Sequence, residues 1–260
     1  MDLFISDVHL GGQEPAWEDE KSRILSEVIR RSGAGDRLLL LGDIFDVWIG
    51  WNRVVPAGFH RTLTALEDAS DRGVEMHFLA GNHDFHESAT LGPAIGLHFH
   101  REAFRLECGD LGRHVMLSHG DEPAGSNPSY RLLHSLIRAR PLVTLGRCLP
   151  PDLLLQWTQA WSRTSRRQHV EREGSEYWYR QYRERVVRKW WSSGARFVIC
   201  GHHHCASIEE SPEGVLVNLG HWLSRPTFGI REGSSFELRQ WTKHGDTVLD
   251  RASLTAKPPP

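Results

Sequence analysis

Cysteine is scarce in this chain: only four of its 260 residues are cysteines, at positions 108, 148, 200 and 205. They form no Cys-x-x-Cys pair, and their density is far below that of a scaffold held together by disulfides. We therefore expect reduced thiols, serving as small buried apolar residues in a reducing compartment.

Long hydrophobic runs are also missing. No uninterrupted apolar stretch approaches the roughly 18 residues that a membrane-spanning helix needs. No basic segment with an apolar run behind it precedes the polar residues Asp7 and His9, so the sequence predicts no signal peptide. We expect a cytoplasmic protein.

A strong net charge is absent as well, because 31 Lys and Arg residues nearly balance 33 Asp and Glu residues, for a net charge of -2. The distribution is uneven: residues 131–191 hold 13 basic and 5 acidic residues, and the rest of the chain is acidic. The length and the 39% hydrophobic content indicate one domain with an insertion.

Short apolar segments alternate with longer amphipathic ones in the first half of the chain, which is typical of strands joined by helices. Strands are predicted at 3–6, 37–41, 75–80, 103–107, 114–118 and 196–200, and helices at 17–31 and 57–71. Antiparallel strands are expected near 206–210, 214–219, 226–231 and 235–242.

Polar clusters follow five of these strands. They are Ser6-Asp7-Val8-His9, Gly42-Asp43, Gly81-Asn82-His83-Asp84, Ser118-His119-Gly120-Asp121 and Gly201-His202-His203-His204. Singly, an Asp after a strand is often a helix cap and a loop His is often only solvated. Five clusters together are not explained in that way. Ligands of α/β sheets bind beyond the carboxyl ends of strands, so we expect the clusters to converge.

The clusters supply seven candidate metal ligands, namely Asp7, His9, Asp43, Asn82, His119, His202 and His204. Hard oxygens mixed with imidazoles suit manganese, iron or zinc better than calcium or copper. Seven side chains are too many for one ion, but they can serve two ions about 3.5 to 4 Å apart if one carboxylate bridges them. Asp43 is the candidate bridge, and manganese is the expected metal, with iron and zinc as alternatives.

In this order the motifs resemble those of the calcineurin-like metallophosphoesterases, from residue 2 to about residue 222. The resemblance implies an α/β fold, a four-layer αββα sandwich that carries a helical insertion (cap). It implies one metal held by Asp7, His9, Asp43 and His204, and a second held by Asp43, Asn82, His119 and His202. It also implies catalytic roles for Asp43, His83 and Asp84. A water activated by both ions would attack phosphorus, His83 would stabilise the developing charge, and Asp84 would orient His83.

Within this superfamily, the chain is similar to the UDP-2,3-diacylglucosamine diphosphatases of lipid A synthesis. The likeness rests on the segment from Gly42 to Gly50, on residues 118–121, and on Tyr130 at the start of a basic helical insertion. Such enzymes cleave a pyrophosphate, releasing UMP and an acylated sugar phosphate. The chain differs from that family at His83, where Arg is usual, at Trp51-Asn52 and Ser126-Asn127, where paired Asp is usual, and at His221, where Asp is usual.

The insertion is predicted at residues 128–193, between the phosphoesterase segments 1–127 and 194–245, with a C-terminal tail at 246–260. Its arginines alternate with aromatic residues, which is also the pattern of helices that pack their aromatics on the body and expose their arginines. A functional alternative is that arginines grip phosphate while an apolar face holds acyl chains or rests on an anionic membrane. That face comprises Leu132, Leu136, Leu142, Leu145, Leu153 and Trp157.

A nucleic-acid surface is a further alternative for the insertion, but the leucine-rich stretch and the acidic remainder of the chain favour a lipid. The expected reaction is therefore hydrolysis of UDP-2,3-diacylglucosamine, next to the cytoplasmic face of the inner membrane. A soluble phosphodiesterase, a nucleotide pyrophosphatase and a non-catalytic scaffold are the alternatives. The candidate substrate contacts are Asn82, His83, Tyr130, Arg163, Arg166 and Arg167.

Overall fold

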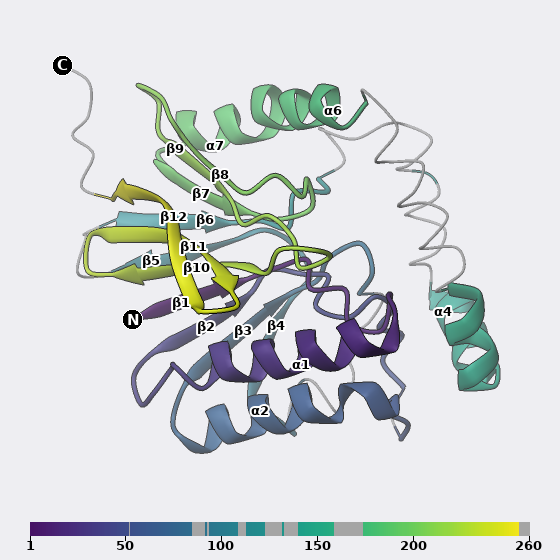
Figure 1. The fold of residues 1–260 in the computed structure, drawn as a ribbon. Coiled ribbons are helices and arrows are strands. Elements are labelled where there is room, and N and C mark those ends of the chain that lie inside the picture. The colour runs from purple at the N-terminus through teal and green to yellow at the C-terminus, as the bar shows by residue number, and fades with distance from the viewer. Residues whose placement is uncertain are drawn as a thin grey trace.

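Two β-sheets packed face to face form the centre of the protein, seen in a computed structural model (Figure 1). The structure describes residues 1–51, 53–84, 92, 94–108, 113–122, 132, 140–158 and 174–254. In this part of the chain, the first sheet has the order β12 (Gly245–Ser253), β11 (Ser235–Thr242), β10 (Thr227–Glu232), β1 (Asp2–Ile5), β2 (Arg37–Leu40), β3 (Glu75–Leu79) and β4 (Leu97–His100). The second has the order β5 (Phe104–Cys108), β6 (Arg113–Leu117), β7 (Phe197–Cys200), β9 (Val215–Asn218) and β8 (Ser207–Glu210).

Helices cover both outer faces of the pair of sheets. The helices α1 (Pro15–Ile29) and α2 (His60–Asp71), the latter preceded by the short η1 (Ala57–Phe59), cover the first sheet. The helices α6 (Gly174–Tyr182) and α7 (Arg188–Ser192), joined by the π-helical turn η4 (Arg183–Val187), cover the second. The layers therefore follow the order α, β, β, α, as the resemblance implies.

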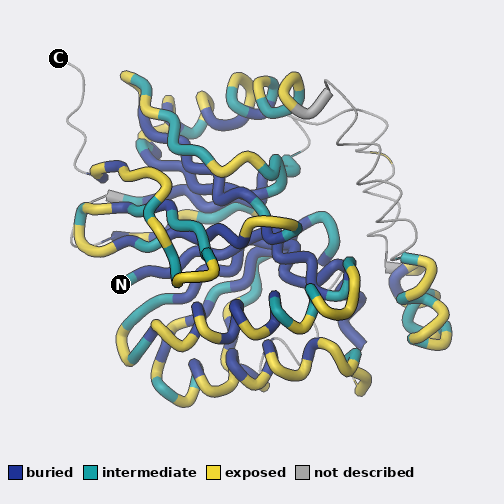
Figure 2. Tube along the Cα trace, in the orientation of Figure 1, coloured by how far each residue is buried: buried dark blue, intermediate teal, exposed yellow. Residues whose placement is uncertain are grey.

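The central strands are buried on both faces because they are nearly continuous runs of large apolar residues. In β1, Leu3 and Ile5 pack toward the helices, whereas Phe4 points into the core between the two sheets. In β7, Phe197 lies in that inter-sheet core, and Val198 packs beneath the helices of the other face. Figure 2 shows the burial concentrated in these strands and exposure on the outer sides of the helices.

Strand direction brings the predicted loops together. β1, β2, β3 and β4 run parallel, and so do β6 and β7 in the second sheet. The carboxyl ends of β1, β2 and β3 therefore share one edge of the first sheet, and those of β6 and β7 share an edge of the second. The loops after these five strands carry every predicted metal ligand.

Part of the insertion lies outside the described residues. Its described portion includes α4 (Arg140–Cys148) and a helical segment at 151–158, which lie to one side of the sandwich, on the side opposite the N-terminus (Figure 1). In the part of the chain that the structure describes, no helix is both long and apolar enough to cross a membrane.

The structure corrects three expectations from the sequence. Residues 246–253, assigned to a tail, lie in β12, which pairs antiparallel with β11. Residues 97–100 form β4, which was not predicted: its apolar residues alternate with histidines as in a half-buried strand, but over four residues only. Cys108 and Cys200 are buried as expected, but Cys148 and Cys205 are exposed; all four cysteines are free thiols.

Candidate metal centre

Backbone hydrogen bonds tie the loops after the five strands to one another. The amides of Asp7 and His9 donate to the carbonyls of Gly42 and Asp43, at 3.1 and 2.9 Å. The amide of Gly201 donates to the carbonyl of His119 at 2.9 Å. The two sheets are then joined at the site itself, because the amide of His202 donates to Oδ2 of Asp7 at 2.9 Å.

Strained backbone marks these loops. Among the described residues, the non-glycine residues with positive φ are Asp7, His9, Asp43, His202 and His204, with values from 50° to 64°. Non-glycine residues adopt this left-handed region rarely, and such strain concentrates at functional sites. All five had been predicted as metal ligands.

Two glycines make the close approach of the loops possible. A Cβ on Gly201 would collide with Oδ2 of Asp7, and a Cβ on Gly81 would collide with Oδ1 of Asp43. Each glycine directly precedes a predicted ligand in the sequence. Their absent side chains leave room for a carboxylate from the neighbouring loop.

Three of the predicted ligands form the first half of the site. Nε2 of His204 lies 3.2 Å from Oδ1 of Asp7 and 3.4 Å from Nε2 of His9. Nε2 of His9 lies 3.8 Å from the same oxygen of Asp7. These atoms lie within 4.8 Å of one another, so they can ligate one ion.

Three further ligands form the second half. Oδ1 of Asn82 lies 3.0 Å from Nε2 of His119 and 2.8 Å from Nδ1 of His202. The asparagine comes from the loop after β3, whereas the two histidines follow β6 and β7 of the other sheet. The second half therefore spans the junction of the two sheets.

Asp43 joins the two halves through a single oxygen. Its Oδ2 lies 3.8 Å from Nε2 of His9 in the first half and 3.5 Å from Nε2 of His119 in the second. Nε2 of His83 approaches the same oxygen at 3.9 Å. The other oxygen, Oδ1, accepts the backbone amide of His83 at 2.8 Å and is therefore engaged in holding the loop.

Backbone carbonyls orient two of the imidazole rings toward Asp43. Nδ1 of His119 lies 2.8 Å from the carbonyl of Leu41, and Nδ1 of His83 lies 2.5 Å from the carbonyl of Asp46. A carbonyl can only accept, so each Nδ1 carries the proton. Nε2 of each ring therefore faces the site, and in neutral His119 it has a lone pair for a metal.

Asp46 is a functional residue that the sequence analysis did not single out. It is 1% exposed, and its Oδ1 lies 3.6 Å from Nδ1 of His9, the ring nitrogen opposite the one that faces Asp7. It therefore orients His9 as carboxylates behind metal-bound histidines commonly do. The available signal was an acidic residue inside the otherwise apolar run from Ile44 to Ile49.

The structure corrects the expected role of Asp84. Oδ2 of Asp84 accepts the backbone amides of Asp43 and Gly81, at 2.8 and 2.9 Å, so this residue braces the two loops. The carbonyl of Asp46, and not Asp84, holds the ring of His83. Burial, with the nearby charge of Asp43, raises the pKa of Asp84 to about 7.

Electrostatics couple the carboxylates and imidazoles. Burial alone would raise the pKa of Asp43, but His119 and His83 hold it well below its ordinary value. Burial would lower the pKa of His119, but Asp43 holds it well above its ordinary value. Burial lowers the pKa of His202 to about 4, so this ring is neutral and ready to ligate.

The residues fit a pair of divalent cations. Oδ1 of Asp7 is buried and accepts no hydrogen bond from the described residues, although histidine nitrogens surround it. A buried carboxylate oxygen without a donor is costly, and a cation would satisfy it. All seven predicted ligands and His83 come together here. The remaining predicted substrate contacts, Tyr130, Arg163, Arg166 and Arg167, lie outside the described residues.

Comparison with known proteins identifies the family of this chain. UDP-2,3-diacylglucosamine hydrolase from Porphyromonas gingivalis is 28% identical over 257 residues, covering 90% of this chain and 95% of the relative. The Escherichia coli O6:H1 enzyme of the same name is 33% identical over 148 residues, 57% of this chain and 59% of the relative. The structure of wild-type Vps29 from Entamoeba histolytica aligns with 97% of this chain and 98% of its own, at 14% identity and a TM-score of 0.46. The family model for calcineurin-like phosphoesterases matches residues 3–206, and the chain belongs to this family of metal-dependent phosphoester hydrolases.

Proposed function

We propose that this protein hydrolyses the pyrophosphate of UDP-2,3-diacylglucosamine, releasing UMP and 2,3-diacylglucosamine 1-phosphate. The observation that carries the proposal is a pair of helical segments, residues 140–148 and 151–158, that expose apolar side chains and pack with other residues on the loop after Asp46. The similarity to the Porphyromonas gingivalis hydrolase, which extends over nearly the whole of both chains, supports the same substrate.

Seven side chains would hold the two ions. Asp7, His9, His204 and Asp43 surround the first position, and Asp43, Asn82, His119 and His202 surround the second. Manganese suits this mixture of oxygen and imidazole donors, as iron and zinc also do. Two bound cations would supply Lewis-acid charge to a phosphoryl group and lower the pKa of water.

The chain's own residues have three tasks in this reaction. Oδ2 of Asp43 bridges the two halves and fixes their separation. His83, whose side chain is 24% exposed at the mouth of the site, directs Nε2 to the place where a phosphoryl oxygen gains charge. Asp84 keeps the loops of Asp43 and Gly81 together and so keeps both groups in place.

These helical segments pack on the loop after Asp46. Val47, Ile49 and Trp51 form a small buried cluster with Val143 of α4, and Nε of Arg147 donates to the carbonyl of Ile49 at 3.1 Å. The amide of Trp48, in the same loop, donates to the carbonyl of His83 at 3.0 Å. The helices of the insertion therefore rest on the segment that positions a catalytic group.

Several apolar side chains of these helices are exposed: Leu142 (47% exposed), Leu145 (59%), Leu153 (38%) and Trp157 (62%). Leu132, which precedes them in the chain, is 64% exposed. An apolar patch of this kind, next to a site for a charged group, suits a substrate with acyl chains and a pyrophosphate. Tyr130, Arg163, Arg166 and Arg167 are proposed to contact the anionic part of that substrate.

A substrate with two acyl chains resides in a membrane, so we propose that the protein works in the cytoplasm at the surface of the inner membrane. The exposed leucines would touch the bilayer as the substrate is withdrawn. Nucleic acid is not proposed as a partner, because these helices expose several apolar side chains.

The decisive experiment incubates the purified protein and manganese with UDP-2,3-diacylglucosamine and measures UMP release. The proposal predicts release from this substrate and much slower release from an unacylated UDP-sugar. No UMP at high enzyme concentration would refute it. Comparable turnover of unacylated UDP-sugars or cyclic nucleotides would favour a soluble nucleotide pyrophosphatase or phosphodiesterase, the function that His83 and the replaced acidic pairs at 51–52 and 126–127 allow.

A further inference from the structure

A buried lysine lies behind the first half of the metal centre. Lys21, on α1, is 0% exposed. Its ammonium donates to the carbonyls of Val8 and His9, at 3.0 and 2.8 Å, and lies 3.0 Å from Oε1 of Glu18. Burying an ammonium group is costly, so the contacts of this group must compensate for its loss of water.

These two carbonyls belong to the peptide groups on either side of the Cα atom of His9. The orientations of those two peptides define φ and ψ of His9, and φ is 50°, in the left-handed region. Strain of this kind persists only where surrounding contacts enforce it. Lys21 fixes both carbonyls at once and thereby enforces the backbone conformation that directs the imidazole of His9 toward Asp7 and Asp43.

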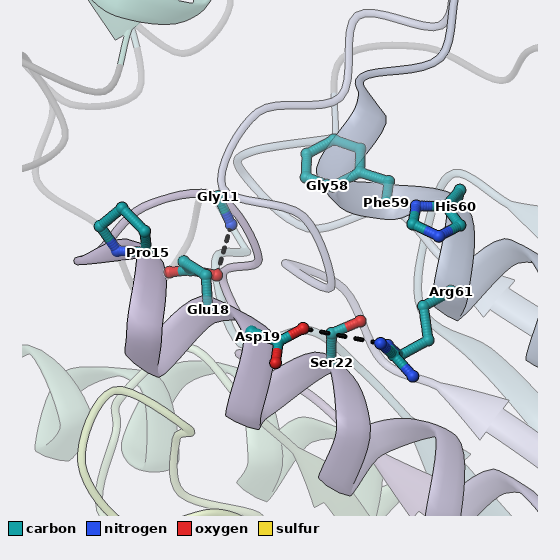
Figure 3. A pocket seen from close by; sticks show the side chains of 9 residues that line it. All are labelled: Gly11, Pro15, Glu18, Asp19, Ser22, Gly58, Phe59, His60 and Arg61. Atoms are coloured by element: carbon teal, nitrogen blue, oxygen red, sulfur yellow. Dashed lines mark hydrogen bonds and ion pairs between the residues drawn. The ribbon is translucent and has the colours of Figure 1, made fainter.

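Glu18 completes the arrangement on the other side of the ammonium. Its two carboxylate oxygens accept the amides of Gly11 and Gln13, each at 2.7 Å. Figure 3 shows Glu18 at the wall of a pocket, bonded to Gly11, at the point where the loop turns into α1. Glu18 and Lys21, one helical turn apart, thus hold the loop from Val8 to Gln13 through two carbonyls and two amides.

We propose that Lys21, with Glu18 as its counter-charge, is a positioning residue that sets the affinity of the first metal position through His9. The inference rests on the proposed two-metal site but not on the choice of substrate. It assigns a metal-binding role to a residue that contacts neither metal nor substrate. Removal of a group that orients a ligand commonly weakens metal binding by about 10- to 100-fold.

The test measures manganese binding by calorimetry and the electron paramagnetic resonance spectrum of the bound ions. The wild-type protein should bind two ions and give the signal of a spin-coupled pair. Lys21→Met keeps the approximate length of the side chain and removes its charge. It should weaken the binding of one of the two ions by about 10- to 100-fold. At intermediate manganese, its spectrum should be that of isolated ions.

Arg23→Met is the matched control. Arg23 lies on the same helix and also pairs with glutamates, Glu20 and Glu27, but its side chain is 50% exposed, whereas that of Lys21 is buried. This control should bind both ions as the wild-type protein does. Lys21→Arg, which restores a cation, should recover part of the lost affinity.

Glu18→Gln keeps the test decisive if Lys21→Met does not fold, because Glu18 is 17% exposed and its amide analogue can still accept one backbone amide. Glu18→Gln should weaken the binding of the same ion. Unchanged affinity for both ions in Lys21→Met, or in Glu18→Gln if only that variant folds, would overturn the proposal, even if the melting temperature falls. A wild-type protein that binds two ions but hydrolyses no acylated UDP-sugar would instead overturn the proposed function and leave this inference intact.

Discussion

Oδ2 of Asp43 lies 3.5 Å from Nε2 of His119, and this contact joins the loop after β2 in one sheet to the loop after β6 in the other. Without a metal, the two residues form an ion pair. The pKa of His119 is raised and the pKa of Asp43 is lowered, in both cases against the effect of burial, because each group lies beside the opposite charge. The proton on Nε2 of His119 therefore occupies the place of a cation.

Metal binding should release protons and strengthen as the pH rises. The raised pKa keeps His119 protonated near neutral pH in the metal-free protein, and manganese must displace that proton. We expect tighter manganese binding at pH 8 than at pH 6.5. Calorimetry in buffers of different ionisation enthalpy measures the protons released, and a release of zero would contradict this prediction.

Asp43→Asn should lower activity because it weakens the binding of both metal ions. The neutral side chain removes the oxygen that faces both halves of the site, so both ions should bind more weakly. We expect activity to fall by at least about 100-fold, since the electrostatic contribution of the ions amounts to several kcal/mol. Asp19→Asn, at a side chain that is 76% exposed on α1, should leave metal content and activity unchanged.

His83→Ala should separate catalysis from metal binding. Nε2 of His83 points to the site, but both halves keep their own ligands without it. We expect kcat to fall by about 10²- to 10³-fold, as for removal of one group that stabilises transition-state charge. The metal content, measured by mass spectrometry, should stay at the wild-type value. His83→Arg, the residue usual in the similar family, should recover activity in part.

Charged residues on the apolar surface should affect only acylated substrates. Leu145 and Trp157 are 59% and 62% exposed, so Leu145→Glu and Trp157→Glu should fold normally. Each should raise KM for UDP-2,3-diacylglucosamine and weaken binding to anionic vesicles. Leu249→Glu, at a leucine of β12 that is 46% exposed, is the control and should change neither. Equal KM values in all three variants would argue against an acyl-binding surface.

Acid should remove a stabilising ion pair far from the site. Asp246 pairs with Arg31 at 2.5 Å and also with Arg239, and these contacts lower its pKa from 3.8 to about 2 despite burial. A lowered pKa means stability that is present above pH 4 and is lost as the pH falls toward 2. Urea unfolding should therefore show Asp246→Asn less stable than wild type at pH 7, with the difference shrinking below pH 4.

The ligand set of the metal centre was determined by the sequence. Apolar runs such as Leu38 to Leu41 could only become buried strands, and each ended in a Gly- or Asp-containing cluster. Because parallel strands end at the same edge, the order of the motifs was enough to bring all seven ligands together. The αββα layers were predicted by the family resemblance, whereas the alternation of segments predicted only strands joined by helices.

Contacts between distant segments were decided only by the tertiary structure. Asp46 and Lys21 could not be told from an ordinary acidic and basic residue in the sequence, since their roles depend on the ring of His9 and on two backbone carbonyls. The strand β12 forms because β11 offers it an edge, which no local pattern encodes. The candidate metal ligands can therefore be recognised from local sequence motifs. The residues that orient these ligands can be recognised only in the folded structure, because their hydrogen bonds form only when the loops come together.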